Sequence, residues 1–311
     1  GWLAMIEHSA VLLSEAVESL VVDPDGYYID GTYGRGGHST AILEKLSARG
    51  KLLAIDKDPE AIADGRSRFD GELRVAFRHA SFAAIKEAAA AFGDVGAAGI
   101  LLDLGVSSPQ LDRAERGFSF LRDGPLDMRM DSSCGVSAAE WLNMAAEADI
   151  AAVLKNYGDE RYARRIAAAI VRERSIASIE RTARLAKIVA TAHPSWERGR
   201  HPATKSFQAI RIHINNEMQD LDRFLSEVID ALEIGGRLVV ISFHSLEDRR
   251  VKRFIRDEQR GLVLPKNIPL MEVDRGVRLI KVGRAIKPSD GEIDRNARAR
   301  SAVMRVAERV A

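Results

Sequence analysis

The sequence predicts an α/β protein in which a parallel sheet is interrupted by an inserted, all-helical domain. Short apolar runs alternate with helical stretches over the first third of the chain, and this alternation breaks over residues 111–213. A run rich in β-branched residues then follows at Arg237–Phe243. We therefore expect a discontinuous sheet domain, residues 1–110 with 214–311, around a helical substrate-recognition domain of residues 111–213.

The front third supplies the first strands and their crossover helices. We expect strands at Tyr27–Asp30, Leu52–Asp56, Leu73–Phe77 and Ile100–Leu104, and helices at Ser39–Ala48, Pro59–Phe69 and Phe82–Phe92. Strands that alternate with helices in this way pair in parallel, because each helix carries the chain back to the edge where the previous strand began.

The rest of the chain completes the sheet after the insert. The insert has few strand signals and is rich in Ala, Arg and Glu at helical spacing. A helix over Asn215–Leu232 is stopped by Gly235 and Gly236, and Arg237–Phe243 follows as a fifth parallel strand. Two alternating runs, Val277–Val282 and Ala302–Val306, predict an antiparallel edge pair.

Composition excludes several classes of protein. The 311 residues are 46% hydrophobic, 6% aromatic and 29% charged, which is typical of a globular protein and not of a disordered or fibrous chain. No run approaches the 18 apolar residues of a membrane span. The one cysteine, Cys134, has no partner for an intrachain disulfide, and the start shows no secretory pattern. We expect a cytoplasmic protein.

The net charge of +1 hides an asymmetry between the halves of the chain. Residues 1–154 carry 14 basic and 24 acidic side chains, whereas residues 155–311 carry 32 and 21. A basic back half suits a protein that binds a polyanion with one part and a small ligand with another. Unevenly distributed, solvated charge is the alternative.

The first candidate site follows the first strand. Glycines in the run from Asp30 to His38 let the backbone turn tightly and approach a ligand. Asp56 ends the second strand, where an acid can accept hydrogen bonds from ribose hydroxyls. Since Asp58 before Pro59 is the better helix cap, Asp56 is left for the ligand. These residues predict nucleoside binding, with a dehydrogenase and an S-adenosylmethionine methyltransferase both open.

The fourth strand adds an acid and a Ser-Ser-Pro turn at the same predicted edge. Methylation of an exocyclic amine is helped by oxygen acceptors that hold its N–H groups, and Asp103 with the Ser107–Pro109 turn is suited to supply them. Asp103 and Ser108 are therefore the candidate catalytic residues. A plain turn after a strand is the alternative.

Seven blocks, in order, resemble the bacterial small-subunit rRNA cytosine-N4 methyltransferase family, RsmH (older name MraW). The resemblance covers nearly the whole chain from His8 onward. The blocks are His8–Glu15, Asp30–Ser39, Asp103–Asp112, Arg116–Phe120, Leu126–Asp131, Lys205–Ile212 and Ser242–Arg249.

This resemblance implies a class I, Rossmann-like methyltransferase sheet. It implies that the enzyme methylates N4 of a cytidine, C1402, in the decoding region of 16S rRNA within the 30S subunit. The cofactor would be S-adenosylmethionine, leaving S-adenosylhomocysteine, with no metal and no membrane partner; a homodimer is one option for the oligomeric state. The residues matching the family's cofactor positions are Gly36, Gly37, His38, Asp56, Phe82, Asp103 and Gln110.

Basic residues in the same blocks are candidates for contacts with RNA phosphates. They are Arg116, Arg129, Lys205, Arg211 and Arg249, with His244 as a residue that could touch the target base. Ion pairs within the chain, with Asp127 or Asp248, are the alternative for the cations. For His244 the alternative is a helix start in which Ser245 is the cap and Asp248 lies three residues on.

Two other functions stay open at this point. A nicotinamide oxidoreductase on the same sheet would bind NAD, whereas the methyltransferase reading predicts binding of S-adenosylmethionine and none of NAD. A catalytically silent RNA-binding assembly factor would need the basic half of the chain but neither Asp56 nor Asp103.

Overall fold

The computed structural model describes residues 10–196, 199–263 and 275–311. His8 and Ser9 of the first resembling block therefore lie outside the described residues. The chain divides into two compact units: unit 1 is Gly1–Gly105 with Asp220–Ala311, and unit 2 is Val106–Gln219. The predicted insert, residues 111–213, falls within unit 2. Over the described ranges, no helix has both the length and the apolar character needed to cross a membrane.

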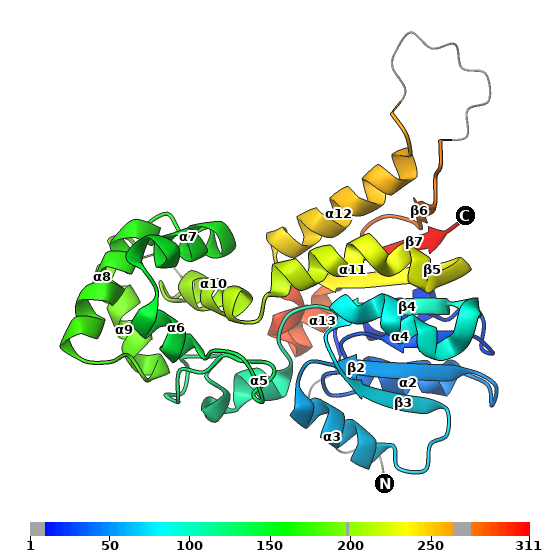
Figure 1. Cartoon of the computed structure of the whole chain (residues 1–311), viewed down its shortest axis with the longest axis horizontal. Helices are drawn as coiled ribbons and strands as arrows, with labels where there is room; N and C mark the ends of the chain where they lie inside the picture. The colour runs from blue at the N-terminus through cyan, green and yellow to red at the C-terminus, as the bar shows by residue number, and fades with distance from the viewer. Residues whose placement is uncertain (1–9, 197–198, 264–274) are drawn as a thin grey trace. The chain divides into compact units, whose positions relative to one another are not determined.

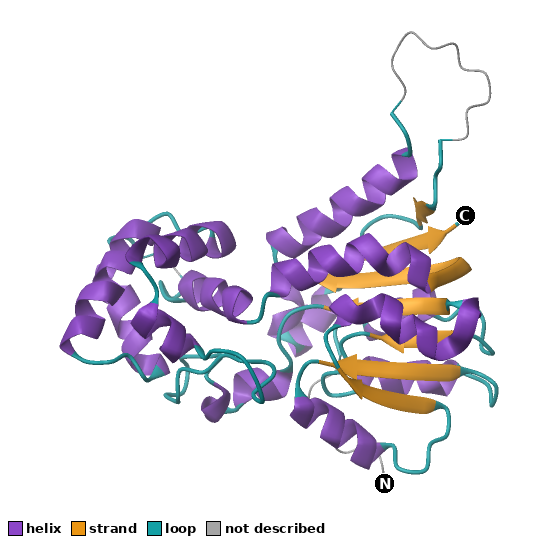
Figure 2. Cartoon of the chain, viewed as in Figure 1, coloured by secondary structure: helices purple, strands orange, loops and turns teal. Residues whose placement is uncertain are grey.

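Unit 1 is built on one seven-stranded sheet in the order β3-β2-β1-β4-β5-β7-β6 (Figures 1 and 2). Strands β1 to β5 pair in parallel, and β7 pairs antiparallel with both β5 and β6. The α/β fold class and the antiparallel edge pair are as the sequence predicts. The strands are β1 Tyr27–Asp30, β2 Lys51–Asp56, β3 Val75–His79, β4 Ala97–Asp103, β5 Leu232–Ser242, β6 Leu279–Lys281 and β7 Val303–Arg309.

The carboxyl ends of the parallel strands meet at one edge of this sheet. Asp30, Asp56 and Asp103 are the last residues of β1, β2 and β4. The chain runs outward from β1 to β3 and then returns to place β4 on the other side of β1. In open α/β sheets, ligands bind at such a reversal of strand order. The fold therefore directs attention to the loops beyond these three acids.

Helices cover both faces of the sheet in unit 1. The α-helices are α1 Leu13–Leu20, α2 Gly37–Lys45, α3 Pro59–Arg68, α4 Ile85–Ala89, α11 Glu217–Ala231, α12 Ser245–Arg260 and α13 Asp290–Arg295. The 3-10 helices are η1 Phe82–Ala84, η2 Ala90–Val95 and η4 Ala297–Ser301. Helix α11 begins in the last residues of unit 2 and continues into unit 1.

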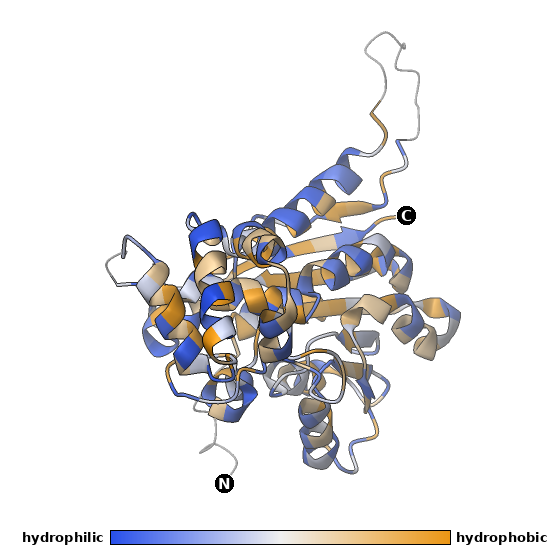
Figure 3. Ribbon diagram, turned by 60° about the vertical axis from the view of Figure 1, so that its left-hand side comes forward, coloured by the Kyte–Doolittle hydropathy of each residue, from blue (hydrophilic) through white to orange (hydrophobic). Residues whose placement is uncertain are grey.

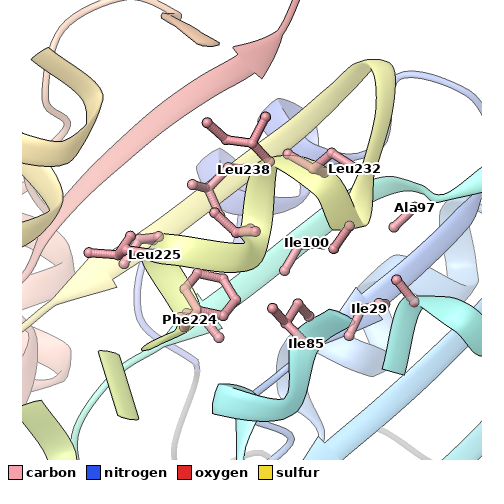
Figure 4. Packing of buried hydrophobic residues seen from close by; sticks show 14 of the residues in the cluster. Ile29, Ile85, Ala97, Ile100, Phe224, Leu225, Leu232 and Leu238 are labelled. Carbon is pink, nitrogen blue, oxygen red and sulfur yellow. The ribbon is translucent and has the colours of Figure 1, made fainter. Parts of the chain in front are cut away.

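Alternate residues along the strands point to opposite faces of the sheet and belong to two separate hydrophobic cores. Ile29, Ile100 and Leu238 pack with Phe224 of α11 and Ile85 of α4 on one face (Figure 4). Their sequence neighbours point to the other face and pack against α1 and α2. Burying a large aliphatic side chain contributes about 1.5–3 kcal/mol. Both faces are therefore apolar, and the sheet edge is left for chemistry.

Several predicted elements of unit 1 differ in the structure. Strand β4 starts at Ala97, three residues earlier than predicted, and β5 starts at Leu232, so Gly235 and Gly236 lie within the strand and do not end α11.

The helix predicted over Phe82–Phe92 is three short pieces, η1, α4 and η2, and the positive φ of Gly93 (75°) breaks the last of them. Strand β3 starts two residues later than predicted, at Val75, because Leu73 is 87% exposed and lies outside the sheet.

Unit 2 is a bundle of helices around its own apolar core. Its elements are α5 Ser108–Asp112, η3 Ala114–Arg116, α6 Ala138–Met144, α7 Glu147–Gly158, α8 Ala163–Ile176, α9 Thr182–Ala192 and α10 Thr204–Ile214. The core is formed by Leu142, Leu154, Ile166, Val189 and Ile210, among others. In Figure 3 its helices show orange and blue sides, as amphipathic helices do.

Residues 117–137 of unit 2 form no helix, although the sequence predicts a mostly helical region. Gly117 has a φ of 71°, and a Cβ there would lie 2.2 Å from the Pro125 carbonyl oxygen. Met128 also adopts a positive φ, 64°. Such backbone geometry is incompatible with a continuous helix.

Candidate functional site

Glycines shape the loop that joins β1 to α2. Gly34 and Gly36 have φ values of 56° and 76°, which only glycine adopts without strain. A Cβ on Gly36 would lie 2.6 Å from the Tyr33 hydroxyl oxygen, and one on Gly37 would lie 2.9 Å from the Ala10 Cβ. Tyr33 and Ala10 therefore pack closely against the glycines where α2 begins. Backbone N–H groups at such a helix start are suited to a ligand.

Asp30 holds this loop from inside the protein. The side chain is fully buried, and its carboxylate accepts hydrogen bonds from the Thr32 amide at 3.0 Å and the Ser39 hydroxyl at 2.7 Å. Burial raises the pKa of Asp30, while these hydrogen bonds act in the opposite direction. Asp30 thus joins the end of β1 to the loop and to the first turn of α2.

The sequence predicts that Asp56 is left for a ligand, but in the structure both of its carboxylate oxygens already accept hydrogen bonds. Its two carboxylate oxygens accept hydrogen bonds from the Gly34 amide at 2.7 Å and the Asp58 amide at 2.8 Å. Asp58 does cap α3 as predicted, through the Glu60 amide at 3.0 Å. A carboxylate offers about four lone pairs, so two N–H donors leave acceptor capacity for hydroxyl groups. Burial raises the pKa of Asp56 to about 6.

Asp103 ends β4, which together with β1 flanks the reversal of strand order. Its backbone amide donates to Thr32 Oγ1 at 2.7 Å, and its Oδ2 lies 3.6 Å from His38 Nδ1. Its Oδ1 is buried and has no hydrogen-bond partner within the described part of the chain. Burial raises the pKa of Asp103 to about 6; His38 opposes this effect, and the Asp30 and Glu247 carboxylates add to it.

His38 is buried at the start of α2 with its ring held by the backbone. Nε2 lies 3.0 Å from the Val11 carbonyl oxygen, which can only accept, so Nε2 carries a hydrogen. In the neutral ring, Nδ1 is then an acceptor that faces Asp103. Two acceptors that face each other in this way favour a donor group between His38 and Asp103.

Phe82 begins η1 beyond the end of β3, and its ring is half-buried against the core. It meets Phe224 edge to face, with ring centroids 5.7 Å apart. Beside it, Asp220 Oδ2 accepts from Ser81 Oγ at 2.8 Å and from Lys57 Nζ at 2.7 Å. Asp220 therefore joins the loops after β2 and β3 to α11, and Phe82 belongs to a well-supported wall.

Two ionisable side chains lie beyond the end of β5. Glu247 is 2% exposed, and its Oε2 accepts from the Phe243 amide at 2.8 Å. Its Oε1 lies 2.9 Å from His244 Nε2, at an angle that makes no hydrogen bond. The expectation that Ser245 caps α12 is wrong: His244 is the cap residue, in an extended conformation, and Ser245 is the first residue of the helix.

Unit 2 holds two further predicted site residues, Gln110 and Ser108, on α5. Ser107 precedes this helix and forms a capping box with Gln110, whose Oε1 accepts from the Ser107 amide at 2.9 Å. Gln110 is buried, and Ser108 is the first residue of the helix, followed by Pro109. The Ser-Ser-Pro turn is thus a helix start.

Two of the cations predicted to contact RNA are engaged within unit 2. Arg116 is only 6% exposed, and its Nη2 donates to the carbonyl oxygens of Arg129 and Met130 at 3.1 and 3.0 Å. Arg129 forms a bidentate pair with Asp127, at 2.7 and 3.0 Å. Arg129 therefore forms the ion pair that the intramolecular alternative describes, whereas these bonds of Arg116 go to backbone carbonyls.

The other predicted cations differ in accessibility. Arg211 pairs with Glu217 at 3.0 Å in a largely buried position. Lys205 is half-buried on α10. Arg249 is exposed on the first turns of α12, while the neighbouring Asp248 is paired with Arg305.

Three contributors to the site were not assigned a role from the sequence: Asp30, Thr32 and Glu247. Asp30 ends a strand as Asp56 does, so the same pattern could have identified it. Thr32 acts through a hydrogen bond to β4, and Glu247 through one to the backbone of Phe243. Neither contact can be predicted from the local sequence around these residues.

The arrangement in unit 1 is suited to a cationic or N–H-bearing ligand with hydroxyl groups. Carboxylates of raised pKa line one sheet edge beside a glycine-rich loop, and one carboxylate oxygen there has no partner among the described residues. No three His, Cys, Asp or Glu residues gather as metal ligands in the ranges that the structure describes.

Comparisons with known proteins extend over the whole chain. A sequence profile of the MraW methylase family matches residues 5–310. The protein named ribosomal RNA small subunit methyltransferase H in Chromohalobacter salexigens is 56% identical over 305 residues, covering 97% of this chain and 92% of that protein. The proteins of the same name in Thioalkalivibrio sulfidiphilus and Marinomonas are 56% and 50% identical, and each alignment covers 98% of both chains.

Proposed function

We propose that this chain, which belongs to the MraW methylase family, transfers a methyl group from S-adenosylmethionine to N4 of a cytidine, C1402, in 16S rRNA. Its likeness to small-subunit rRNA methyltransferases over the full length supports the substrate. The observation that carries the chemistry is the buried, unpartnered Oδ1 of Asp103 at the sheet edge.

The residues of unit 1 fit the proposed cofactor. Asp103 Oδ1 is a buried acceptor that lacks a donor, as expected beside an ammonium or amino group that completes the site. The backbone at Gly36 and Gly37 and the ring of His38 would hold the methionine part. Asp56 retains lone pairs for ribose hydroxyls, and Phe82 supplies a ring for the adenine.

Gln110 and Ser108 of unit 2 complete the proposed set. We assign Gln110 to the cofactor by the family's pattern and Ser108, with Asp103, to the target amine. An amide oxygen and a hydroxyl are both able to accept an N–H hydrogen.

The proposed reaction needs an amine that is held and then deprotonated. When bound, the cofactor supplies a methyl carbon made electrophilic by its positive sulfur. The N4 lone pair forms the new C–N bond as the C–S bond breaks and leaves its electron pair on sulfur. Asp103, accepting an N–H hydrogen, would orient that lone pair and take up the departing proton.

The decisive experiment offers unmethylated 30S subunits and protein-free 16S rRNA with methyl-labelled S-adenosylmethionine. Digestion to nucleosides and mass spectrometry identify the product, and RNase mapping places it. N4-methylcytidine at C1402 is expected. A label on a ring carbon or a ribose oxygen contradicts the proposal, as does binding of NAD in place of S-adenosylmethionine.

A matched pair of variants tests the role of Asp103. Asp103→Asn removes the charge at the sheet edge, while Asp70→Asn makes the same change on an exposed residue. We expect loss of methyl transfer by about 10²-fold or more only in Asp103→Asn, the scale of a lost acid–base group. Equal activity in both variants would show that Asp103 does not act on the amine.

A further inference from the structure

A hollow on unit 1 lies apart from the sheet edge that holds the acids. It has a volume of about 460 Å³ and is bounded by α12 on one side and by β6, β7 and the turn after β6 on the other. The buried side chains of Ile255 and Val306 form its floor. Figure 1 shows α12 beside these two strands, and in Figure 3 the same helix is mostly blue.

Cations of both walls surround this hollow, which we call the basic groove. Its lining contains six basic side chains and no Asp or Glu among the residues that the structure describes. Like charges gathered in this way repel one another unless an anion or solvent compensates them. The cations are Lys252, Arg256 and Arg260 on α12, Lys281 and Arg284 around the turn after β6, and Arg305 on β7.

Most of these cations are available to a ligand. Lys252, Arg260, Lys281 and Arg284 are exposed and form no ion pair with any residue of the described ranges. Arg256 pairs with its exposed neighbour Asp257 and with no other acid of the described ranges, whereas Arg305 is already paired with Asp248. Other cations of unit 1 are paired, as Arg237 is with Glu308.

The cations of α12 form a row that starts near the site. Arg249, Lys252, Arg256 and Arg260 are spaced by three, four and four residues, so they share one face of the helix about one turn, ~5.4 Å, apart. Helix α12 begins directly after β5, beside Glu247 and His244. The row therefore leads from the carboxyl edge of the sheet into the basic groove.

We infer that the basic groove binds backbone phosphates of the 16S rRNA on the flank of the target nucleotide, an inference that rests on the proposed function. A row of cations at regular spacing matches a polymer of charges better than a single anion. Among the described residues, the lining contains no aromatic ring on which a base could stack. The groove therefore contacts the backbone and positions the RNA without reading its sequence.

The test removes one unpaired cation from each wall. Binding of unmodified, protein-free 16S rRNA to the double variant Lys252→Gln with Arg284→Gln is measured from 50 to 200 mM salt. The matched control, Lys45→Gln with Arg66→Gln, removes two exposed cations from α2 and α3 of the same unit. Binding of S-adenosylmethionine reports whether unit 1 remains folded, and we expect it to be unchanged in both variants.

Loss of two phosphate contacts lowers the salt slope by about 1.4, because each single-strand contact contributes about 0.7. The ratio of the RNA affinity of the unaltered protein to that of the double variant should then fall by about sevenfold between 50 and 200 mM salt. An unchanged slope, or the same change in the control variant, would overturn the inference.

Two further measurements distinguish the RNA backbone from other ligands of the basic groove. Inorganic phosphate at millimolar concentration should not displace the RNA, and displacement would indicate a site for a small anion. A loss of affinity for 30S subunits but not for protein-free rRNA would indicate a ribosomal protein instead. A product other than N4-methylcytidine would refute the proposed function while leaving the salt slopes unaffected, so the two failures are distinguishable.

Discussion

Thr32 Oγ1 accepts the backbone amide hydrogen of Asp103 at 2.7 Å, and this bond joins the loop after β1 to the end of β4. The same threonine donates its amide to Asp30 at 3.0 Å. One residue, through its hydroxyl and its backbone amide, thus fixes two neighbouring strand ends. The position of the Asp103 carboxylate depends on this link.

Replacing Thr32 with valine should loosen the site while keeping its shape. Thr32→Val leaves the Asp103 amide without its acceptor, which costs about 1–3 kcal/mol of unfolding free energy. Binding of S-adenosylmethionine should weaken as well, measured by calorimetry beside denaturant unfolding. Thr32→Ser retains the oxygen and should restore both properties. If serine behaves as valine does, the hydrogen bond is not what matters.

Alanine substitutions at two glycines with similar backbone angles distinguish the effect of backbone strain from that of steric crowding. Gly36 and Gly71 have φ values of 76° and 83°, so alanine at either position pays about 1–2 kcal/mol for the left-handed region. Only at Gly36 does the new Cβ also meet the ring of Tyr33, which is buried and held edge to face by Phe77.

We therefore expect Gly36→Ala to lose more stability than Gly71→Ala and to be the one that loses cofactor affinity. Thermal unfolding and calorimetric titration measure the two effects. If both variants lost the same cofactor affinity, the backbone conformation alone would account for the loss.

The raised pKa values at the sheet edge predict a pH dependence of stability. For Asp103 the pKa rises from 3.8 to about 6 on folding, so in this window the folded protein binds more protons than the unfolded chain. The unfolding free energy contributed by this group therefore falls as pH rises through the window. Denaturant unfolding between pH 4 and pH 6.5 should show a shallower fall for Asp103→Asn. A parallel curve would contradict the assignment.

Arg116 is expected to stabilise unit 2, not to bind a ligand. Arg116→Met keeps most of the side chain's bulk but removes the donors to two backbone carbonyls. Hydrogen bonds from a charged group contribute about 1.5–3 kcal/mol. We expect a loss of this size in denaturant unfolding. Arg113→Met, which affects an exposed pair with Glu115, should change stability by less than about 1 kcal/mol.

Local patterns were enough to predict the strand ends. The period of the apolar residues located β1 and β2 within a residue, and therefore placed Asp30 and Asp56 at one edge. Glycine content predicted the turn before α2. The cap of α3 followed from Asp58 and Pro59 alone, because capping is a contact between residues two apart.

Contacts between distant segments could not be predicted. The bond from Gly34 to Asp56 and the one from Asp103 to Thr32 exist only once the strands are side by side. Similarly, the charge of Arg116 predicts an exposed side chain, whereas the folded loop of unit 2 buries it against backbone carbonyls. The position of β7 between β5 and β6 also depends on packing across the sheet.

The split of unit 1 across the sequence affects how the chain is made. Strand β4 is translated before unit 2, and its neighbour β5 only afterwards. At roughly 5–20 residues per second, a nascent chain therefore displays one side of β4 unpaired for on the order of ten seconds. Such an edge is prone to associate with other chains. The core of unit 2 is formed only by residues translated in that interval. Unit 2 can therefore fold on the ribosome before β5 is available to pair with β4.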